Sequence, residues 1–197
     1  MSGKRCQVAS LDRMTRLIHL NGPPGIGKST IAQRYAANHP GVLNLDIDVL
    51  RTLVGGWQED FDLAGRLVRP AALAMCTAYL RGGHDVVVPQ LLADPTQLAR
   101  FEAAARQAGA AFVELVLMDD RAGAASRFNR RGSAEPDGAD WHDQVRSIVT
   151  NSGGEELLLR YYDSLAAVVA ERPEAVVVSS IEGEIDATYA AVLAALV

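Results

Sequence analysis

The sequence predicts an α/β fold, in which helices cover both faces of a five-stranded, mostly parallel sheet. Short apolar runs alternate along the chain with longer helical stretches, and these runs lack the polar–apolar alternation of half-exposed strands. The chain has 197 residues, 49% of them hydrophobic and 22% charged, so it can bury a sizeable core. We therefore expect one domain over residues 1–197 that folds without disulfides or a structural metal.

In the N-terminal half, apolar runs predict the strands, and unbroken stretches of helix formers predict the helices. The expected order is a strand at 16–21 (RLIHLN), a helix at 28–38, a strand at 41–46 (GVLNLD), a short helix at 48–54 and a long helix at 62–81. Gly82 and Gly83 stop the long helix, and Pro70 inside it predicts either a kink or a junction between two helices.

The C-terminal half continues the same alternation. The expected order is a strand at 85–89 (DVVVP), a helix from Asp94 toward Gly109, a strand at 111–118 (AFVELVLM), helices at 121–131, 141–150 and 155–171, a strand at 175–179 (AVVVS) and a helix at 184–196. Between the first two of the three consecutive helices, the residues GSAEPDGAD at 132–140 predict a loop.

The composition disfavours several classes of protein. Lys and Arg total 19 against 24 Asp and Glu, and the net charge of −5 makes nucleic acid an unlikely partner. No apolar run approaches the roughly 20 residues of a membrane-spanning helix, and the basic N-terminus lacks the apolar core of a secretory signal. Cys6 and Cys76 show no metal or redox spacing. We expect a cytoplasmic protein without a membrane partner.

The most specific motif joins the first predicted strand to the first predicted helix. Residues 22–29 read GPPGIGKS and fit the phosphate-binding pattern G-x-x-x-x-G-K-[ST] at every fixed position. Glycines let backbone N–H groups turn around phosphate oxygens, and the helix N-terminus adds partial positive charge. Lys28 is expected to reach the β- and γ-phosphates of ATP, and Ser29 to ligate Mg²⁺. The expected nucleotide-binding residues are Gly22, Pro23, Pro24, Gly25, Ile26, Gly27, Lys28, Ser29 and Thr30.

Two aspartates and an arginine follow the second predicted strand. Asp46 and Asp48 lie at the carboxyl end of that strand, the edge at which open parallel sheets bind ligands, and Arg51 lies one helical turn further on. A carboxylate there can take the proton of an attacking hydroxyl or help to hold Mg²⁺, and an arginine can clamp an anionic group. Either aspartate can instead cap the next helix.

These two motifs resemble those of the small P-loop kinases, which include chloramphenicol phosphotransferase, gluconate and shikimate kinases and polynucleotide kinase relatives. The resemblance implies a three-layer P-loop NTPase fold with a small lid. In that group an aspartate after the second strand is the usual general base, a role that the resemblance assigns to Asp48, with Asp46 as the alternative. The runs VVVPQ at 86–90 and VELVLM at 113–118 are also similar to tunicamycin-resistance-type proteins of the same superfamily.

The chain departs from these kinases at the ends of the third and fourth predicted strands. Many of them carry an acidic residue where this chain has Pro89 and Gln90. Gln90 can bind a neutral substrate or satisfy the backbone at the strand end. Asp119 is the nearest match to a Walker-B aspartate, although Asp119 or Asp120 can equally cap the helix that starts at 121.

Arginines after the fourth predicted strand indicate a lid at about 127–142. The i, i+3, i+4 spacing of Arg127, Arg130 and Arg131 brings them to one helix face, and a mobile arginine can neutralise charge during phosphoryl transfer. The resemblance makes Arg127 and Arg131 catalytic candidates, either of which can reach the γ-phosphate. The alternative is a solvated basic face, balanced by acidic residues of the loop that follows.

Other positions carry weaker signals. Trp57 and Phe61 can line an acceptor pocket formed by the helices at about 50–81, or they can simply pack. His19 is expected to lie in the core. In related kinases, loops that contact adenine lie after the fifth strand, where this chain has Ser179 and Ser180.

Together, the motifs predict an ATP- and Mg²⁺-dependent phosphotransferase that acts on a hydroxyl of a small molecule, such as a metabolite, a nucleoside or an antibiotic. The expected catalytic residues are Lys28, Asp48, Arg127 and Arg131; the expected acceptor-binding residues are Asp46, Arg51, Trp57 and Gln90; the expected metal ligands are Ser29 and Asp46. The alternatives are a polynucleotide 5′-hydroxyl kinase and a non-catalytic ATP-binding protein that switches or sequesters a drug. The choices between ATP and GTP and between monomer and homodimer stay open.

Overall fold

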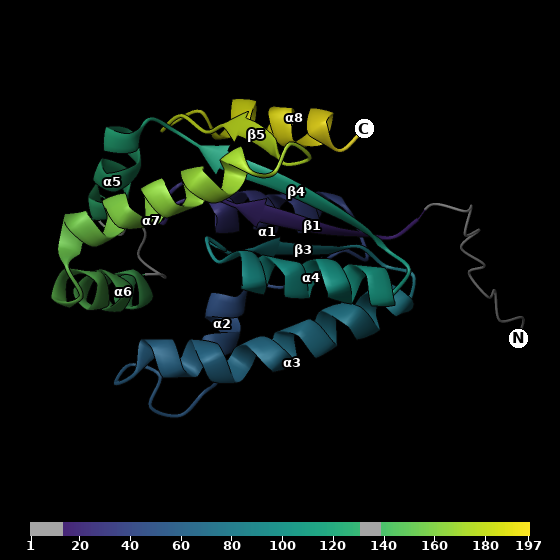
Figure 1. Cartoon of the computed structure of the whole chain (residues 1–197), viewed down its shortest axis with the longest axis horizontal. Helices are drawn as coiled ribbons and strands as arrows, with labels where there is room; N and C mark the ends of the chain where they lie inside the picture. Colours follow the sequence, from purple (N-terminus) through teal and green to yellow (C-terminus); the bar gives the residue numbers. More distant parts are fainter. Residues whose placement is uncertain (1–13, 131–138) are drawn as a thin grey trace, which may run out of the picture.

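The computed structural model describes residues 14–130 and 139–197, and a five-stranded parallel sheet lies at its centre (Figure 1). The strands are β1 (Arg16–Asn21), β2 (Leu43–Asn44), β3 (Val86–Pro89), β4 (Ala111–Met118) and β5 (Val176–Ser179). Their order in the sheet is β2-β3-β1-β4-β5, and every pair is parallel, which confirms the predicted α/β class. Because β1 lies between β3 and β4, the loop after β1 emerges in the middle of the carboxyl edge.

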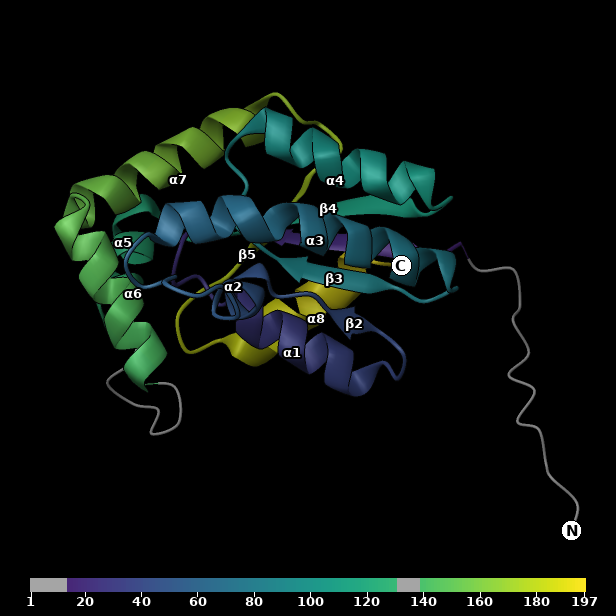
Figure 2. The same cartoon turned by 90° about the horizontal axis from the view of Figure 1, so that it is seen from below.

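Helices cover both faces of the sheet and produce three layers (Figure 2). On one face lie α1 (Lys28–Asn38) and α8 (Ile185–Ala195), and on the other lie α3 (Phe61–Arg81) and α4 (Pro95–Gln107). Successive residues of β1 point to opposite faces, so Ile18 and Leu20 pack toward α1 and α8, whereas Leu17 packs toward α3 and α4. The core therefore consists of two apolar layers, one on each side of the sheet.

Three further helices begin beyond the carboxyl edge of the sheet, and the last of them runs back along it toward α4 (Figures 1 and 2). They are α5 (Arg121–Arg130), α6 (Ala139–Asn151) and α7 (Gly154–Ala170). Phe128 of α5 and Leu158 of α7 form a small apolar cluster, and Val145 and Val149 of α6 pack against it. Because α5 follows β4 directly, this group of helices borders the edge at which the phosphate-binding motif emerges. Among the described residues, no helix is long and apolar enough to span a membrane.

Several boundaries differ from the expectations. Of the expected strand at 41–46, β2 contains Leu43 and Asn44; the N–H of Leu45 still donates a 2.8 Å hydrogen bond to the Val87 carbonyl of β3, and the chain then turns into α2 (Ile47–Arg51). The helix at 61–81 is continuous, so the expectation of two helices meeting at Pro70 is wrong; Pro70 is exposed, and solvent can reach the place where its missing N–H interrupts the helix. Most of the expected loop at 132–140 lies outside the described residues.

Candidate active site

The phosphate-binding motif forms a tight turn between β1 and α1. Gly22, Gly25 and Gly27 have φ angles of 147°, 82° and 105°, in the region that side chains rarely allow. A Cβ atom on Gly22 would lie 2.6 Å from the carbonyl oxygen of Leu117. The glycines of the motif are therefore needed for the turn itself, and the turn leaves backbone N–H groups at the start of α1 to bind an anion.

Gly25 also sets the distance between this turn and α5. A Cβ there would lie 2.8 Å from Cα and 2.9 Å from the backbone nitrogen of Phe128. We expect Gly25→Ala to lower the free energy of unfolding by about 2–4 kcal/mol, because the clash with backbone adds to the strain of a positive φ. Gly83→Ala is the matched control: Gly83 has a φ of 86° but no atom within 4 Å of the added Cβ. Urea unfolding of both variants would contradict this prediction if the two losses were equal.

The side chain of Lys28 reaches back across the turn. Its Nζ donates hydrogen bonds of 2.8 Å to the backbone carbonyls of both Gly22 and Pro23, and the residue is 9% exposed. Ser29 and Thr30 follow in the first turn of α1. The ammonium group is thus already positioned within the loop, where phosphate oxygens would compete with the two carbonyls for its N–H donors.

Asn21, which precedes the motif, fixes the start of the loop. Its Oδ1 accepts hydrogen bonds from the N–H groups of Gly22 (2.9 Å) and Leu92 (3.0 Å). Its Nδ2 donates to the Leu92 carbonyl (3.0 Å) and to Glu114 Oε1 (3.1 Å). All four bonds are buried, so Asn21 ties the phosphate loop to the segment that follows β3. The phosphate-binding pattern does not include this residue.

Asn21 is joined through Glu114 to a network of charged side chains. Glu114 is buried on β4, and its Oε2 accepts a 2.6 Å hydrogen bond from Arg172, which also pairs with Glu102. His19 is fully buried, as expected, and its Nε2 lies 2.8 Å from the carbonyl oxygen of Gln90. Burial lowers the pKa of His19 to about 4, so the imidazole is neutral and its Nε2 is the donor to that carbonyl. A glutamate within the apolar run 111–118 is the sequence signal for this network.

Asp46 and Asp48 have different surroundings. Asp46 caps α2, because its Oδ1 accepts a 3.0 Å hydrogen bond from the backbone N–H of Asp48. Asp48 Oδ1 lies 3.5 Å from Arg51 Nη1, and 41% of the Asp48 side chain is exposed. This Oδ1 is buried, and it has no hydrogen-bond partner within the described ranges. Oδ1 is therefore occupied by the contact with Arg51, and a ligand donor can reach the exposed part of the Asp48 carboxylate.

The charges around Asp48 connect the acidic element to the phosphate loop. Burial raises the pKa of the Asp48 carboxyl group, and the positive charge of Arg51 opposes this rise. Asp46 adds to the rise, whereas Lys28 and Arg69 lower the pKa. Because Lys28 acts on the pKa of Asp48, the two residues belong to one electrostatic environment. A carboxylate with a raised pKa is a stronger proton acceptor.

Arg51 is held between α2 and α3. The residue is 4% exposed, and its guanidinium carbon lies 3.7 Å from the centre of the Phe61 ring. A Cβ on Gly65 would come within 2.8 Å of Arg51 Nη2, so Gly65 makes room for the guanidinium group. Phe61 is thus a packing partner of Arg51. The arginine presents a fixed positive charge beside Asp48.

Gln90 and Trp57 are both buried, with exposed fractions of 8% and 9%. The backbone carbonyl of Gln90 bonds to His19, but its side-chain Oε1 has no hydrogen-bond partner in the described part of the chain. Gln90 therefore accepts a hydrogen bond at the strand end through its backbone, and its side-chain oxygen is buried. Trp57 lies in the connection between α2 and α3.

Arg127 joins three segments beside the phosphate loop. Its Nη2 donates a 3.0 Å hydrogen bond to the Ile26 carbonyl, and its Nη1 donates to Asp119 Oδ2 (3.3 Å) and to the Ser180 carbonyl. Next to it lies a pocket of about 350 Å³, lined by the phosphate loop, α1, α5 and the segment after β5. Arg127 thus links the loop to the wall of this pocket.

Asp120 and Arg130 are further candidates after β4 that lie among the described residues. Asp120 Oδ1 accepts a 2.7 Å hydrogen bond from the N–H of Gly123 at the start of α5, whereas Asp119 holds Arg127. Of the two expected capping candidates, Asp120 takes that place. Arg130 forms an ion pair with Glu182 and also lines the pocket. Arg131 lies outside the described residues.

Solved structures of other proteins share this fold. A gluconokinase from Sinorhizobium meliloti 1021 matches with a TM-score of 0.59 and 18% identity, over 93% of each chain. A chain of the Pnkp1/Rnl/Hen1 RNA repair complex matches with a TM-score of 0.59 and 15% identity, over 84% of this chain and 49% of that chain. A search of curated protein sequences finds no significant match.

The sequence also matches a family model. This model is described as the AAA domain, and it covers residues 17–149, more than half of the chain. The matched segment includes the phosphate loop, the acidic element at 46–51 and the start of the helices beyond the sheet edge. The chain therefore belongs to the AAA domain family and has the P-loop fold of the small kinases.

Proposed function

We propose that this protein is an ATP- and Mg²⁺-dependent phosphotransferase that moves the γ-phosphoryl group of ATP to a hydroxyl group of a small molecule. The observation that carries the proposal is the relation of Asp48 to the phosphate loop. Asp48 lies beside Arg51, 41% of its side chain is exposed, and Lys28 lowers its pKa. A hydroxyl that donates to the exposed part of this carboxylate would stand beside bound phosphates.

ATP would place its phosphates in the loop and its base in the pocket beside Arg127. Lys28 would exchange the carbonyls of Gly22 and Pro23 for phosphate oxygens, which form stronger, charge-assisted hydrogen bonds. The pocket of about 350 Å³ is lined by Ile181 and by the guanidinium group of Arg127, surfaces that suit an aromatic base.

Ser29 and Asp46 are the oxygen donors that would suit Mg²⁺. Ser29 supplies a hydroxyl, and Asp46 supplies a carboxylate whose Oδ1 already caps α2. These are the hard oxygen ligands that the ion prefers, together with phosphate oxygens and water. When bound, Mg²⁺ would offset part of the negative charge on the phosphates.

Transfer would begin when the acceptor hydroxyl donates its hydrogen bond to Asp48. Asp48 would take the proton as the acceptor oxygen bonds to the γ-phosphorus, and the bond from that phosphorus to the oxygen bridging it to the β-phosphorus would break. The products are the phosphorylated acceptor and ADP, with the proton on Asp48. Most of the rate enhancement would come from positioning and electrostatics.

Arginine side chains would supply positive charge beside the acceptor and the phosphates during this step. Arg51, fixed by Phe61 and Gly65, would position the acceptor beside Asp48. Arg127, anchored at the loop, would supply positive charge next to the phosphates. A role for Arg131 at the γ-phosphate stays part of the proposal, as does a lid at about 127–142.

The pH profile of the reaction provides a first test. Burial raises the pKa of Asp48, and a protonated carboxyl cannot accept the hydroxyl proton. We expect kcat/KM to fall as the pH is lowered, with a midpoint above about 3.9, the ordinary pKa of an aspartate. Asp48→Asn should lack this limb. A wild-type rate that stayed constant down to that ordinary value would contradict the role of Asp48 as base.

The acceptor class can be found by linkage, because a ligand that binds only the folded state raises its melting temperature. The protein would be screened first with ATP, ADP and GTP, and then with sugars, nucleosides and antibiotics in the presence of a non-hydrolysable ATP analogue. A true acceptor should add stabilisation to the nucleotide-bound protein. Failure of every nucleotide to stabilise the protein would contradict the proposal.

A polynucleotide 5′-hydroxyl kinase is the second candidate. Arg51 and Arg69 place positive charge around Asp48, and a chain of an RNA repair complex shares the fold. Binding to a strand of several phosphates would weaken steeply with salt. The net charge of −5 favours the small acceptor. If an uncharged acceptor raised the melting temperature of the nucleotide-bound protein equally at low and high salt, this result would favour the small-molecule kinase.

A further inference from the structure

Two side chains of β1 hold the β3–α4 connection, which comprises residues 90–94. His19 and Asn21 are two residues apart on β1, so their side chains point to the same face of the sheet. The His19 ring donates to the carbonyl of Gln90, and the Asn21 amide bonds at 3.0 Å to both the N–H and the carbonyl of Leu92. All three bonds are buried. The strand that leads into the phosphate loop therefore also positions the β3–α4 connection.

The same amide group holds the first residue of the phosphate loop. Asn21 Oδ1 accepts a 2.9 Å hydrogen bond from the N–H of Gly22 in addition to the bond from Leu92. The carbonyl of Gly22 in turn accepts a 2.8 Å hydrogen bond from Lys28 Nζ. A phosphate group that attracted Lys28 would release this carbonyl, while the N–H of Gly22 stays on Asn21. A change at the nucleotide end of the loop would thus reach Leu92 through one carboxamide.

Glu114 determines which way round the Asn21 amide lies. A carboxylate only accepts hydrogen bonds, and this one lies between two donors. Its Oε1 accepts a 3.1 Å bond from Asn21 Nδ2, and its Oε2 accepts a 2.6 Å bond from Arg172 Nε. The Glu114 side chain is fully buried, so these protein groups satisfy it. The nitrogen of the amide therefore faces Glu114, and the oxygen is left for the N–H groups of Gly22 and Leu92.

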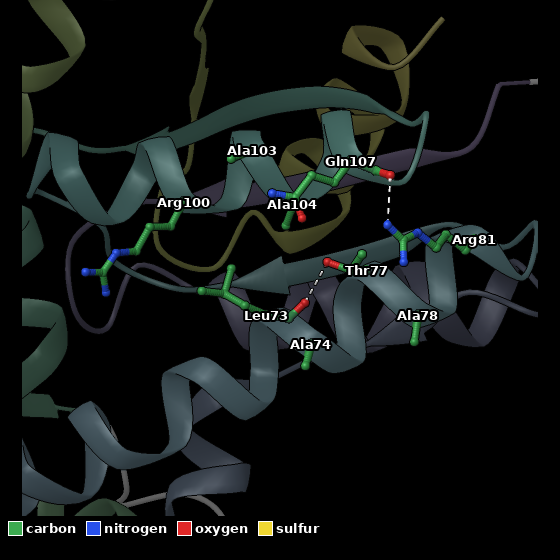
Figure 3. Close-up of a pocket in the computed structure, with 9 residues that line it drawn as sticks. All are labelled: Leu73, Ala74, Thr77, Ala78, Arg81, Arg100, Ala103, Ala104 and Gln107. Atoms are coloured by element: carbon green, nitrogen blue, oxygen red, sulfur yellow. Dashed lines mark hydrogen bonds between the residues drawn. The ribbon is translucent and has the colours of Figure 1, made fainter.

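The helix that follows the β3–α4 connection is anchored at two further places. Arg81 of α3 donates a hydrogen bond to the carbonyl of Gln107, the last residue of α4 (Figure 3). Glu102, in the middle of α4, pairs with Arg172. Because these contacts hold the helix, a displacement that starts at the phosphate loop would be taken up by the short β3–α4 connection.

We propose that Asn21 is a positioning residue that couples the two halves of the active site: through its amide, nucleotide bound in the phosphate loop fixes the β3–α4 connection and the position of Gln90. The inference rests on the proposed function and on the expected role of Gln90 in acceptor binding. A loop whose first residue is already held in place also loses less conformational entropy when phosphate binds. Nucleotide affinity should therefore depend on Asn21 as well.

Amide hydrogen exchange with and without ADP and Mg²⁺ tests the coupling. In wild type, saturating ADP should slow exchange in the phosphate loop and also slow the exchange of the Leu92 amide by about fivefold or more. In Asn21→Asp, saturating ADP should slow exchange in the loop but not at Leu92, because the new carboxylate is repelled by Glu114 and by the Leu92 carbonyl. A merely structural role for Asn21 predicts no response of Leu92 to ADP in wild type.

Asn38→Asp is the matched control for this exchange experiment. The Asn38 amide also donates to a backbone carbonyl, that of Arg34 at 2.9 Å, but it lies at the end of α1 that is remote from the phosphate loop. The same chemical change there should leave the response of Leu92 to ADP as in wild type.

A pair of exchanged groups tests the donor and acceptor pattern. Asn21→Asp sets two carboxylates against each other, and Glu114→Gln sets an N–H against that of either Asn21 or Arg172. Each single variant should weaken ADP binding by about tenfold or more in isothermal titration. In N21D/E114Q the new amide can donate to the new carboxylate and accept from Arg172. We therefore expect the double variant to lose less ADP affinity than either single variant and to regain the response of Leu92.

The outcomes separate this inference from the proposed function. Failure of wild type to bind ADP would overturn both. If ADP binds but leaves the exchange of Leu92 unchanged, or if Asn21→Asp keeps the wild-type response, the coupling through Asn21 is wrong and nucleotide binding stands. A double variant whose loss of affinity equals the sum of the single losses would also overturn the coupling. Should a single variant fail to fold, the wild-type exchange and the double variant, which keeps the net charge and the side-chain shapes, still decide.

Discussion

Replacing Lys28 with methionine is expected to weaken ATP binding by about 100-fold or more and to abolish turnover. Charge-assisted hydrogen bonds are worth about 1.5–3 kcal/mol each, and Lys28 is expected to make such bonds to two phosphates. Its Nζ donates hydrogen bonds to the carbonyls of Gly22 and Pro23, so the variant would also lose these two hydrogen bonds within the loop. Isothermal titration with ATP and with ADP would measure the loss.

The controls for this variant separate binding from folding. Lys28 is 9% exposed, and methionine has a similar length and can occupy the same buried path. The melting temperature without nucleotide should therefore stay close to that of wild type, even though the affinity for ATP falls. An ATP affinity equal to that of wild type, with the fold intact, would contradict the assignment of the loop to phosphate binding.

Asp48→Asn is expected to lower kcat by about 100-fold or more while ATP affinity stays near that of wild type. A general base typically contributes about 10²–10⁴-fold in rate, and asparagine keeps the shape of the side chain without its basicity. The buried Oδ1 of Asp48 lies 3.5 Å from Arg51 and has no hydrogen-bond partner among residues 14–130 and 139–197. Steady-state kinetics with the identified acceptor would give kcat and KM separately.

Asp46→Asn is the matched control for the base. Asparagine can still cap α2, because its carbonyl oxygen can accept the 3.0 Å hydrogen bond from the N–H of Asp48. We therefore expect a smaller loss of kcat in Asp46→Asn than in Asp48→Asn. The reverse order would transfer the role of base to Asp46.

The layered fold could be predicted because its signals are local. Each strand of the sheet is a short apolar run, and the phosphate-binding motif has fixed spacing, so neither depends on distant contacts. The boundaries were harder to predict because tertiary contacts decide them. β2 ends after two residues where the Asp46 cap begins α2, and α3 continues through Pro70 because its inner face packs on the core.

The surroundings of the site could be predicted only in part. The spacing of Asp46, Asp48 and Arg51 marks them as neighbours, but the structure alone reveals that Asp46 caps α2 and that Asp48 lies against Arg51. The partners of Arg127 lie after β1, β4 and β5, so no local pattern indicates them. Asn21 looks from sequence like the end of a strand, and its four hydrogen bonds join segments up to 93 residues apart.

Mass spectrometry of acceptors after incubation with ATP and Mg²⁺ tests the central proposal most directly. The panel would hold sugars, nucleosides, antibiotics and a 5′-hydroxyl oligonucleotide, each incubated with wild-type protein and with Asp48→Asn. The proposal predicts that at least one small molecule gains the mass of a single phosphoryl group, that ADP appears in equal amount, and that Asp48→Asn loses both products. ATP that binds without any transfer, or transfer to the oligonucleotide alone, would contradict it.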